Sequence, residues 1–146
     1  MAELKQFLKT FPCSRYYAEH RLLAWHPRGI FDEQMADVVI EVLEIEEILS
    51  SRPFNRYSDL SLFTEIQLKM DHVFKLAERR RTAGETVRSA FFADTIVGLT
   101  IARMYESLMA GAIIQVRAFS RREQAAEWLN VPVSVLLPGE LGAALG

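Results

Sequence analysis

The stretch 86–110, TVRSAFFADTIVGLTIARMYESLMA, contains the two hydrophobic patterns from which the fold prediction starts. Residues 86–93 are a mostly apolar run of the length of a buried strand. Asp94 or Thr95 then offers an N-cap for a helix that extends to about Ala110, and Gly111 directly beyond it is typical of a helix end. A strand followed at once by a helix is the repeating unit of α/β proteins.

The same unit recurs on both sides of this stretch. Before it, the sequence predicts a hairpin over 16–25 that turns at the polar residues 19–21, a helix from Asp32 to about Ser50, strands over 54–60 and 63–68, and a helix from Asp71 to about Gly84. After it come a strand over 113–119 and a helix over 120–130, where Ser120 and Glu123 fit a capping box. This order predicts an α/β sandwich with a mixed, mostly parallel sheet of about five strands and about four helices, antiparallel only at the hairpin.

The length of 146 residues suits one domain. We place this domain at residues 14–131, after an N-terminal extension of residues 1–13 and before an apolar C-terminal tail of residues 132–146. The leucines of the tail are Leu136, Leu137, Leu141 and Leu145. Three arrangements of the tail stay open, because it either lies over the domain, meets a partner or is loosely ordered.

The charge balance and the absence of long apolar runs exclude several classes of partner. Seventeen basic and nineteen acidic side chains give a net charge of −2 and a pI of 5.9, so no overall field attracts nucleic acid. The first residues mix charged with apolar side chains, unlike a signal peptide. No window approaches the roughly 20 apolar residues that span a bilayer. We therefore expect a cytoplasmic protein with no nucleic-acid partner and no integral membrane segment.

The usual signatures of catalysis and of cofactor binding are absent from the sequence. Cys13 is the single cysteine, which excludes an internal disulfide and the common multi-cysteine metal sites. The three histidines fall on different predicted elements, and no glycine-rich phosphate loop is present. The sequence thus predicts no catalytic residue, no metal and no cofactor, and favours a binding protein over an enzyme.

Two predicted helices carry opposite charges. Residues 29–51 contain seven carboxylates and no lysine or arginine, whereas the helix that begins at Asp71 ends with Lys75, Arg79, Arg80 and Arg81. The acidic face is either a solvated surface or a surface that pairs with a basic partner. The basic end either stabilises its own helix against the macrodipole or, through Arg79 and Arg80, binds a phosphate or an acidic protein.

The third predicted helix is apolar around most of its circumference. Its candidate contact residues are Met104, Tyr105 and Leu108. A helix that is apolar on more than one side needs cover on more than one side. A second subunit, the C-terminal tail, an apolar ligand or ordinary core packing would each supply that cover, and we expect a homodimer.

Two segments resemble a known family. Residues 115–129, QVRAFSRREQAAEWL, are similar to the last strand and helix of bacterial SpoIIAA-like proteins of the STAS superfamily, and Asp59-Leu60-Ser61 resembles the Asp-Leu-Ser segment of that superfamily. The predicted order of elements is similar over about residues 14–130. The resemblance implies a SpoIIAA-like α/β domain that acts by binding either an anti-sigma kinase or another regulatory protein and has no catalytic machinery of its own.

The sequence departs from that family at the phosphoacceptor loop. Sigma-control antagonists carry an Asp-Ser-Ser/Thr-Gly-like loop before the second helix, whereas residues 65–71 contain no serine. Ser58, Ser61 and Thr64 remain candidate phosphoacceptors, with turn or capping roles as the alternative. We therefore predict a regulatory protein-binding module without the usual phosphoacceptor loop. The alternative is a carrier or sensor of a small apolar ligand or lipid.

Overall fold

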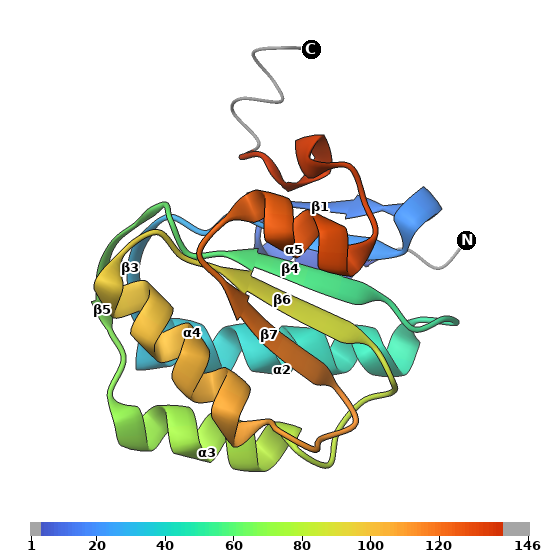
Figure 1. Cartoon of the computed structure of the whole chain (residues 1–146). Helices are drawn as coiled ribbons and strands as arrows, with labels where there is room; N and C mark the ends of the chain where they lie inside the picture. The colour runs from blue at the N-terminus through green and yellow to red at the C-terminus, as the bar shows by residue number, and fades with distance from the viewer. Residues whose placement is uncertain (1–3, 139–146) are drawn as a thin grey trace.

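The structure, a computed structural model, describes residues 4–138, and its centre is a five-stranded sheet with the strand order β1-β2-β4-β6-β7 (Figure 1). The strands are β1 (Ser14–Tyr17), β2 (Leu22–Trp25), β4 (Asn55–Asp59), β6 (Arg88–Phe92) and β7 (Gln115–Phe119). β1 and β2 form the antiparallel hairpin, and the other neighbours pair in parallel. The predicted α/β class and the mixed, mostly parallel sheet are confirmed.

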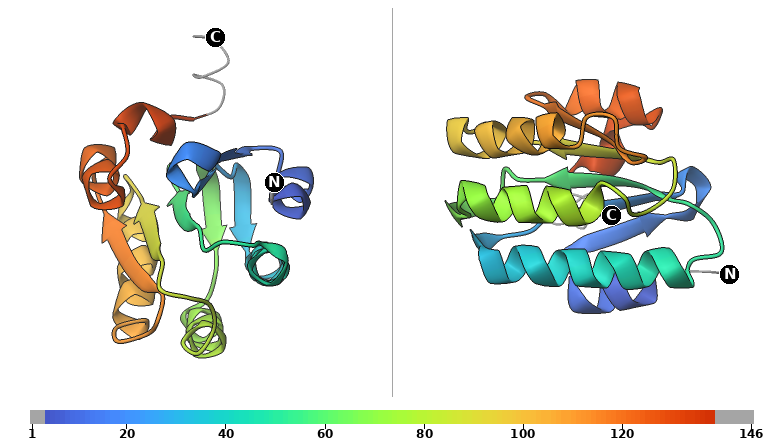
Figure 2. Two further views of the ribbon diagram at one scale, coloured as in Figure 1. Left: turned by 90° about the vertical axis from the view of Figure 1, so that its right-hand side faces the viewer. Right: turned by 90° about the horizontal axis from the view of Figure 1, so that it is seen from below.

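The described helices lie on both faces of this sheet. They are α1 (Lys5–Thr10), α2 (Glu33–Leu49), α3 (Met70–Arg80), α4 (Ile96–Leu108) and α5 (Arg122–Leu129), with 3₁₀ turns η1 (Ala18–His20) and η2 (Val133–Leu136). From β2 to β7, each parallel strand lies beside the one before it, always on the same side. Because the connections between parallel strands are right-handed, the helices in these connections, α2, α3 and α4, lie on the same face of the sheet. Figure 2 shows these three helices on one side of the sheet and α5 on the other.

The four predicted helices correspond to α2, α3, α4 and α5, and the structure adds α1, which lies within the expected N-terminal extension. A helix of six residues is not stable alone and depends on tertiary contacts. Leu4 and Phe7 supply these contacts, since they are buried in a cluster that includes Trp25 and Phe54. The buried carboxylate of Glu46 on α2 accepts hydrogen bonds from the backbone N–H groups of Gln6, at 2.8 Å, and Phe7, at 3.1 Å.

A second, two-stranded sheet was not predicted. Its strands are β3 (Gly29–Asp32) and β5 (Phe63–Gln67), which pair in parallel. β5 corresponds to the strand predicted over 63–68, whereas β3 follows Pro27 too closely to stand out in the sequence. The rings of Phe31 and Phe63 stack across the pair with centroids 4.7 Å apart. Because β3 leads into α2 and β5 leads towards α3, this small sheet joins the starts of the two helices.

The described part of the C-terminal tail lies over the domain. Leu136 of η2 is fully buried and belongs to the core cluster between the sheet and α5, together with Leu22, Tyr57 and Leu129. Of the three arrangements considered for the tail, residues 132–138 adopt the first. Leu141 and Leu145, which the sequence analysis also named, lie outside the described residues.

Two predicted N-caps are confirmed and two are wrong. Asp32 accepts a hydrogen bond from the backbone N–H of Met35 at 2.8 Å, and Thr95 accepts one from that of Gly98 at 3.1 Å. By contrast, α3 begins at Met70, which places Asp71 in the first turn, where its charge still favours the helix dipole. The predicted capping box at Ser120 and Glu123 does not form, because the helix starts one residue later, with Arg121 as N-cap.

Candidate functional site

The main candidate site is a cavity of about 110 Å³ between the sheet and the three helices of one face. Its lining is largely apolar and includes Trp25 and Phe91 from the sheet, Val39 from α2, Leu76 from α3 and Ala102 from α4. It arises because α3 packs against α2 and α4 rather than against strands, and Figure 2 shows α3 spanning the gap between its neighbours. A cavity of roughly 150 Å³ holds benzene, so a small molecule is the right size of occupant.

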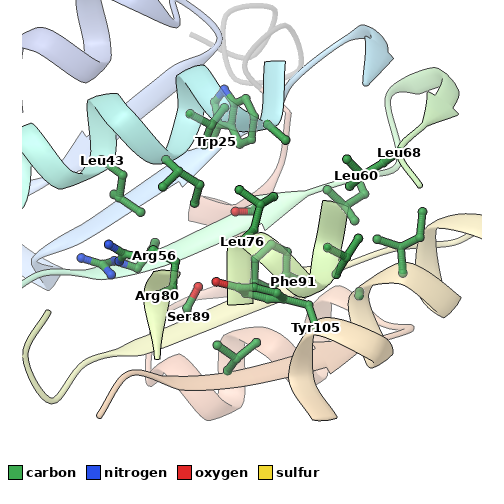
Figure 3. A pocket seen from close by; sticks show the side chains of 18 of the residues that line it. Trp25, Leu43, Arg56, Leu60, Leu68, Leu76, Arg80, Ser89, Phe91 and Tyr105 are labelled. Atoms are coloured by element: carbon green, nitrogen blue, oxygen red, sulfur yellow. The ribbon is translucent and has the colours of Figure 1, made fainter. Parts of the chain in front are cut away.

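One end of the cavity is polar. Arg56 of β4, Arg80 of α3, Ser89 of β6 and Tyr105 of α4 contribute their side chains there. In Figure 3 the hydroxyl of Tyr105 points towards this end, whereas Leu60 lies at the far end of the cavity. Arg56 is 6% exposed and Arg80 is 2% exposed, so both guanidinium groups are removed from water.

The two buried arginines share one carboxylate. Glu47 Oε2 lies 3.0 Å from Arg56 Nη1, and the Glu47 carboxylate accepts hydrogen bonds from Arg80 Nη1 at 2.9 Å and Nη2 at 2.6 Å. Burial raises the pKa of Glu47, but the two guanidinium groups lower it more, so its net shift is downward. Burial lowers the pKa of Arg56 to about 10, and its side chain therefore stays charged at neutral pH.

The same arginine has an unused donor. Arg56 Nε is buried and has no hydrogen-bond partner among the described residues. Its guanidinium carbon lies 4.5 Å from the centre of the Phe54 ring, a contact that holds the planar group against an aromatic face. Arg56 also lines an open groove of about 390 Å³ on the outer side of this cluster, together with Glu47 and Arg52. The ion-paired cluster thus separates the cavity from the groove.

The acidic and basic helices pair with one another within the chain. Arg79 Nε lies 3.1 Å from both carboxylate oxygens of Glu44, and His72 Nε2 lies 2.7 Å from Asp37 Oδ1. These contacts correct the expectation that the acidic face of α2 is either solvated or free for a partner. The sequence shows the charge of each helix but not that α3 packs against α2, which is why the pairing was missed.

A second polar cluster surrounds Asp59 at the end of β4. Asp59 is fully buried, and its Oδ2 accepts hydrogen bonds from the Tyr57 hydroxyl at 2.7 Å and from Arg122 Nε at 2.9 Å. Its Oδ1 accepts from the backbone N–H and the hydroxyl of Ser61, at 3.0 and 2.5 Å. Burial lowers the pKa of Arg122, but the Asp59 carboxylate raises it more. With both oxygens occupied, Asp59 ties β4 to the start of α5.

His26 belongs to the edge of this cluster. Its Nε2 lies 2.8 Å from the carbonyl oxygen of Leu136, so that nitrogen carries the hydrogen and donates it. The same atom is 3.8 Å from Asp59 Oδ2. Burial lowers the pKa of His26. The imidazole is therefore neutral near pH 7 and connects β2 to the C-terminal segment.

The three candidate phosphoacceptors lie in different surroundings. Ser61 is held by Asp59 and also accepts a hydrogen bond from Arg122 Nη2 at 3.1 Å. Ser58 lines the cavity, and Thr64 is exposed on β5. The structure therefore does not bring the three hydroxyl groups together at one site.

Two of the three candidate contact residues of α4 pack against other parts of the chain. Tyr105 and Leu108 pack against a cluster that contains Ala77 of α3 and Ile114, and Met104 is half-buried. Arg79 remains exposed at the surface, whereas Arg80 is buried.

Sequence reasoning missed the polar end of the cavity. The alternation in β4 places Arg56 on the same face as Phe54, Ser58 and Leu60. A charged residue inside such an apolar strand face is a signal for a buried charged group. Its partner Glu47 comes from a different element, so the sequence alone does not connect the two.

Within residues 4–138, no helix is long and apolar enough to cross a membrane. The same residues contain no group of three or more histidine, cysteine, aspartate or glutamate side chains that could hold a metal ion.

Comparisons with known proteins concern the fold. No protein-family model matches the sequence, and no curated protein matches it significantly. The solved structure of an uncharacterised protein of the DUF3478 family from Shewanella loihica PV-4, described as having a SpoIIAA-like fold, is similar to this chain. The two are 15% identical, the match covers 74% of this chain and 83% of that one, and the TM-score is 0.49. The α/β class of this chain follows from its own strand order and helix positions, described above.

Proposed function

We propose that this protein binds a small, mostly apolar molecule in the cavity beneath α3 and acts as its carrier or sensor, without catalysis. The observation that carries the proposal is the cavity itself, about 110 Å³ of space with largely apolar walls. Well-packed interiors contain few voids larger than a water molecule, and each void costs stability. A cavity of this size is therefore explained more simply by an occupant than by poor packing.

The chemistry of the lining supports a binding role over an enzymatic one. The described lining residues include the hydroxyl groups of Ser58, Ser89 and Tyr105, but no histidine, carboxylate, lysine or thiol that would activate them. Cys13 lies outside the cavity, and burial raises the pKa of its thiol, which keeps it protonated and unreactive.

The volume limits the occupant to a small molecule. Pockets for drug-sized ligands have volumes of about 300–1,000 Å³. At about 110 Å³, the cavity suits a single ring or a chain of about six carbons.

Filling the cavity should abolish binding. Ala102 is 2% exposed and lines the cavity, so in Ala102→Leu the larger side chain occupies the space of a ligand. We expect wild type to bind at least one of toluene, hexanamide and hexanoate, as measured by chemical shifts of the cavity residues in NMR. Ala102→Leu should weaken that binding at least about tenfold.

The matched control is Ala110→Leu, which adds the same atoms at an exposed position after α4 and should bind as wild type does. If none of the three probes shifts the resonances of cavity residues in wild type, the proposed function is wrong. The same holds if Ala102→Leu binds as tightly as wild type.

A second candidate is the regulatory protein-binding module that the sequence resemblance implies, which we also expect to be cytoplasmic and homodimeric. The observation in its favour is the exposure of apolar side chains at the starts of α3 and α4. Ile96 is 86% exposed, Val97 56%, Met70 62% and Phe74 53%. Both helix starts follow the carboxyl ends of parallel strands, so these side chains lie on one side of the molecule. Exposed apolar groups that gather in this way mark contact surfaces.

A further inference from the structure

We propose that the molecule held in this cavity is a small carboxylic acid, whose carboxylate lies at the polar end beside Arg56 and Tyr105 while its apolar body fills the rest. The inference rests on the proposed function and specifies its ligand. Four features carry it, namely the charge of the cluster, the unused donor, the direction of the tyrosine hydroxyl and the shape of the lining.

The cluster at the polar end has an excess of positive charge. Among residues 4–138, its ion pairs join three guanidinium groups, those of Arg56, Arg79 and Arg80, to two carboxylates, those of Glu44 and Glu47. Two of the three arginines are almost completely buried. The buried arginines are paired with Glu47 and Glu44, and the surplus charge is that of the exposed Arg79, so the cluster as a whole attracts an anion to this end of the cavity.

The unused donor is the reason that we assign the anion to Arg56. Arg56 Nε is buried and has no hydrogen-bond partner in the part of the chain that the structure describes, while Nη1 of the same group already contacts Glu47 at 3.0 Å. Buried donors in native proteins are nearly always satisfied, so an unpaired guanidinium N–H is the mark of a group that is absent from the structure. A carboxylate oxygen is the strongest common acceptor for such a donor.

Tyr105 supplies a second donor from the opposite wall. Figure 3 shows its hydroxyl directed towards the end where Arg56 and Arg80 lie. Burial raises the pKa of Tyr105, so its hydroxyl keeps its proton and is able to donate. A planar carboxylate has two oxygens and suits two donors from opposite walls, whereas a phosphate would leave further charged oxygens against apolar walls.

The lining beyond the charged cluster determines which chemical groups the rest of the ligand carries. Leu60, Phe91 and Ile101 are apolar and line the cavity beyond the charged cluster. These three side chains offer no partner for a second polar group, and the polar atoms that the lining has beyond the cluster are uncharged, namely the Ser58 hydroxyl and Trp25 Nε1, which is also buried without a partner among the described residues. The expected ligand is therefore an acid with one polar end and a body of about six carbons.

Matched acids and amides test the inference with the full chain. Hexanoate and hexanamide, and likewise benzoate and benzamide, have nearly the same shape and differ in charge. We expect calorimetry at pH 7 to give about tenfold tighter binding for each acid than for its amide, because hydrogen bonds to charged groups are the stronger ones. This comparison uses wild type and does not depend on the folding of a variant.

The variant Arg56→Lys then tests the assigned residue. Lysine keeps the charge beside Glu47 but has no Nε donor in a planar group. We expect Arg56→Lys to weaken hexanoate binding about tenfold and hexanamide binding by a smaller factor, because a hydrogen bond from Nε to a neutral amide oxygen is weaker than one to a carboxylate. Arg103→Lys, at an exposed position of α4, is the matched control and should bind both as wild type does.

The outcomes separate this inference from the proposed function. If acid and amide bind equally, the inference is wrong while the binding function stands. If neither acid nor amide binds and toluene does not bind either, both are wrong. An acid preference that survives unchanged in Arg56→Lys overturns the assignment to Arg56. An acid preference that persists in Ala102→Leu places the acid outside the cavity and also overturns the inference.

Discussion

The imidazole of His26 connects two distant parts of the chain. It is 5% exposed and donates a hydrogen bond to the carbonyl oxygen of Leu136, at 2.8 Å. In the unfolded chain this histidine has a pKa near 6.5, and burial lowers that pKa in the folded protein. The folded protein therefore takes up the proton only at a lower pH than the unfolded chain does. The unfolded state then binds more protons in that interval, and acid favours unfolding.

His26 should therefore make stability sensitive to mild acid. The contribution of the neutral imidazole is complete above about pH 6.5 and is lost as the pH falls through that value towards the lower pKa of the folded state. His26→Gln keeps a side-chain N–H for Leu136 but does not titrate. We expect urea unfolding to show a larger loss of stability between pH 7.5 and 5.5 for wild type than for His26→Gln. Parallel curves for the two proteins would contradict this.

Single residues were predictable where the sequence carries their role locally. Asp32 and Thr95 cap their own helices, and their partners lie three residues away. Asp59 was noticed through the resemblance, but its partner Arg122 is distant in the chain. Ser120 fits a local capping pattern that does not form. The pattern contains no information on Arg122, whose bond to Asp59 and stacking on Phe92, at 4.6 Å, fix the start of α5.

At the scale of elements, α3 is held to α2 by charge on one side and to α4 by apolar contacts on the other. Arg79 and Arg80 are consecutive residues of α3, but one side chain is exposed to solvent and the other is buried. The side chain of Arg79 is 45% exposed where it contacts Glu44, and that of Arg80 is 2% exposed where it contacts Glu47.

Replacement of these two arginines should have unequal effects. Arg80→Leu leaves Glu47 buried with a single arginine, and we expect a loss of about 3–5 kcal/mol in the free energy of unfolding. Arg79→Leu removes an exposed pair and should cost less than about 1 kcal/mol. Chemical denaturation of the two variants measures the difference. Equal losses would show that burial of Arg80 does not determine the energy of its ion pair.

The charged elements also show the limit of sequence reasoning. The period of α2 correctly separates apolar from acidic positions, because that pattern depends only on the geometry of one helix. The acidic side of α2 faces α3 because of how α3 packs. No local sequence pattern indicates that packing. The cavity has the same origin, since it results from the distance between α3 and the sheet rather than from any one segment.

At the scale of the whole molecule, the alternation of strands and helices was enough to predict the sheet, because each long element has its own hydrophobic period. The parts that were missed, α1 and β3, are short. α1 depends on Glu46 and Trp25, and β3 depends on its pairing with β5, so both are formed by distant contacts rather than by local preference.

The exposed apolar side chains at the start of α4 are the contact that we test for the expected homodimer. If Ile96 and Val97 form the contact, light scattering should give twice 16.7 kDa for wild type and 16.7 kDa for Ile96→Glu. Ile48→Glu is the matched control, since Ile48 is 82% exposed at the far end of α2, and this variant should remain dimeric. A monomeric wild type would remove the homodimer, and a dimeric Ile96→Glu would remove this contact.

The small sheet of β3 and β5 gives the two ends of α3 different attachments. Main-chain hydrogen bonds fasten the segment before Met70, and these do not respond to ionic strength. The other end is fastened to α2 by side-chain charges, of which the Arg79 pair is open to screening by salt. If α3 moves to admit the proposed ligand, salt that screens the Arg79–Glu44 pair should loosen the end of α3 near Arg80, and ligand exchange should then become faster at high ionic strength.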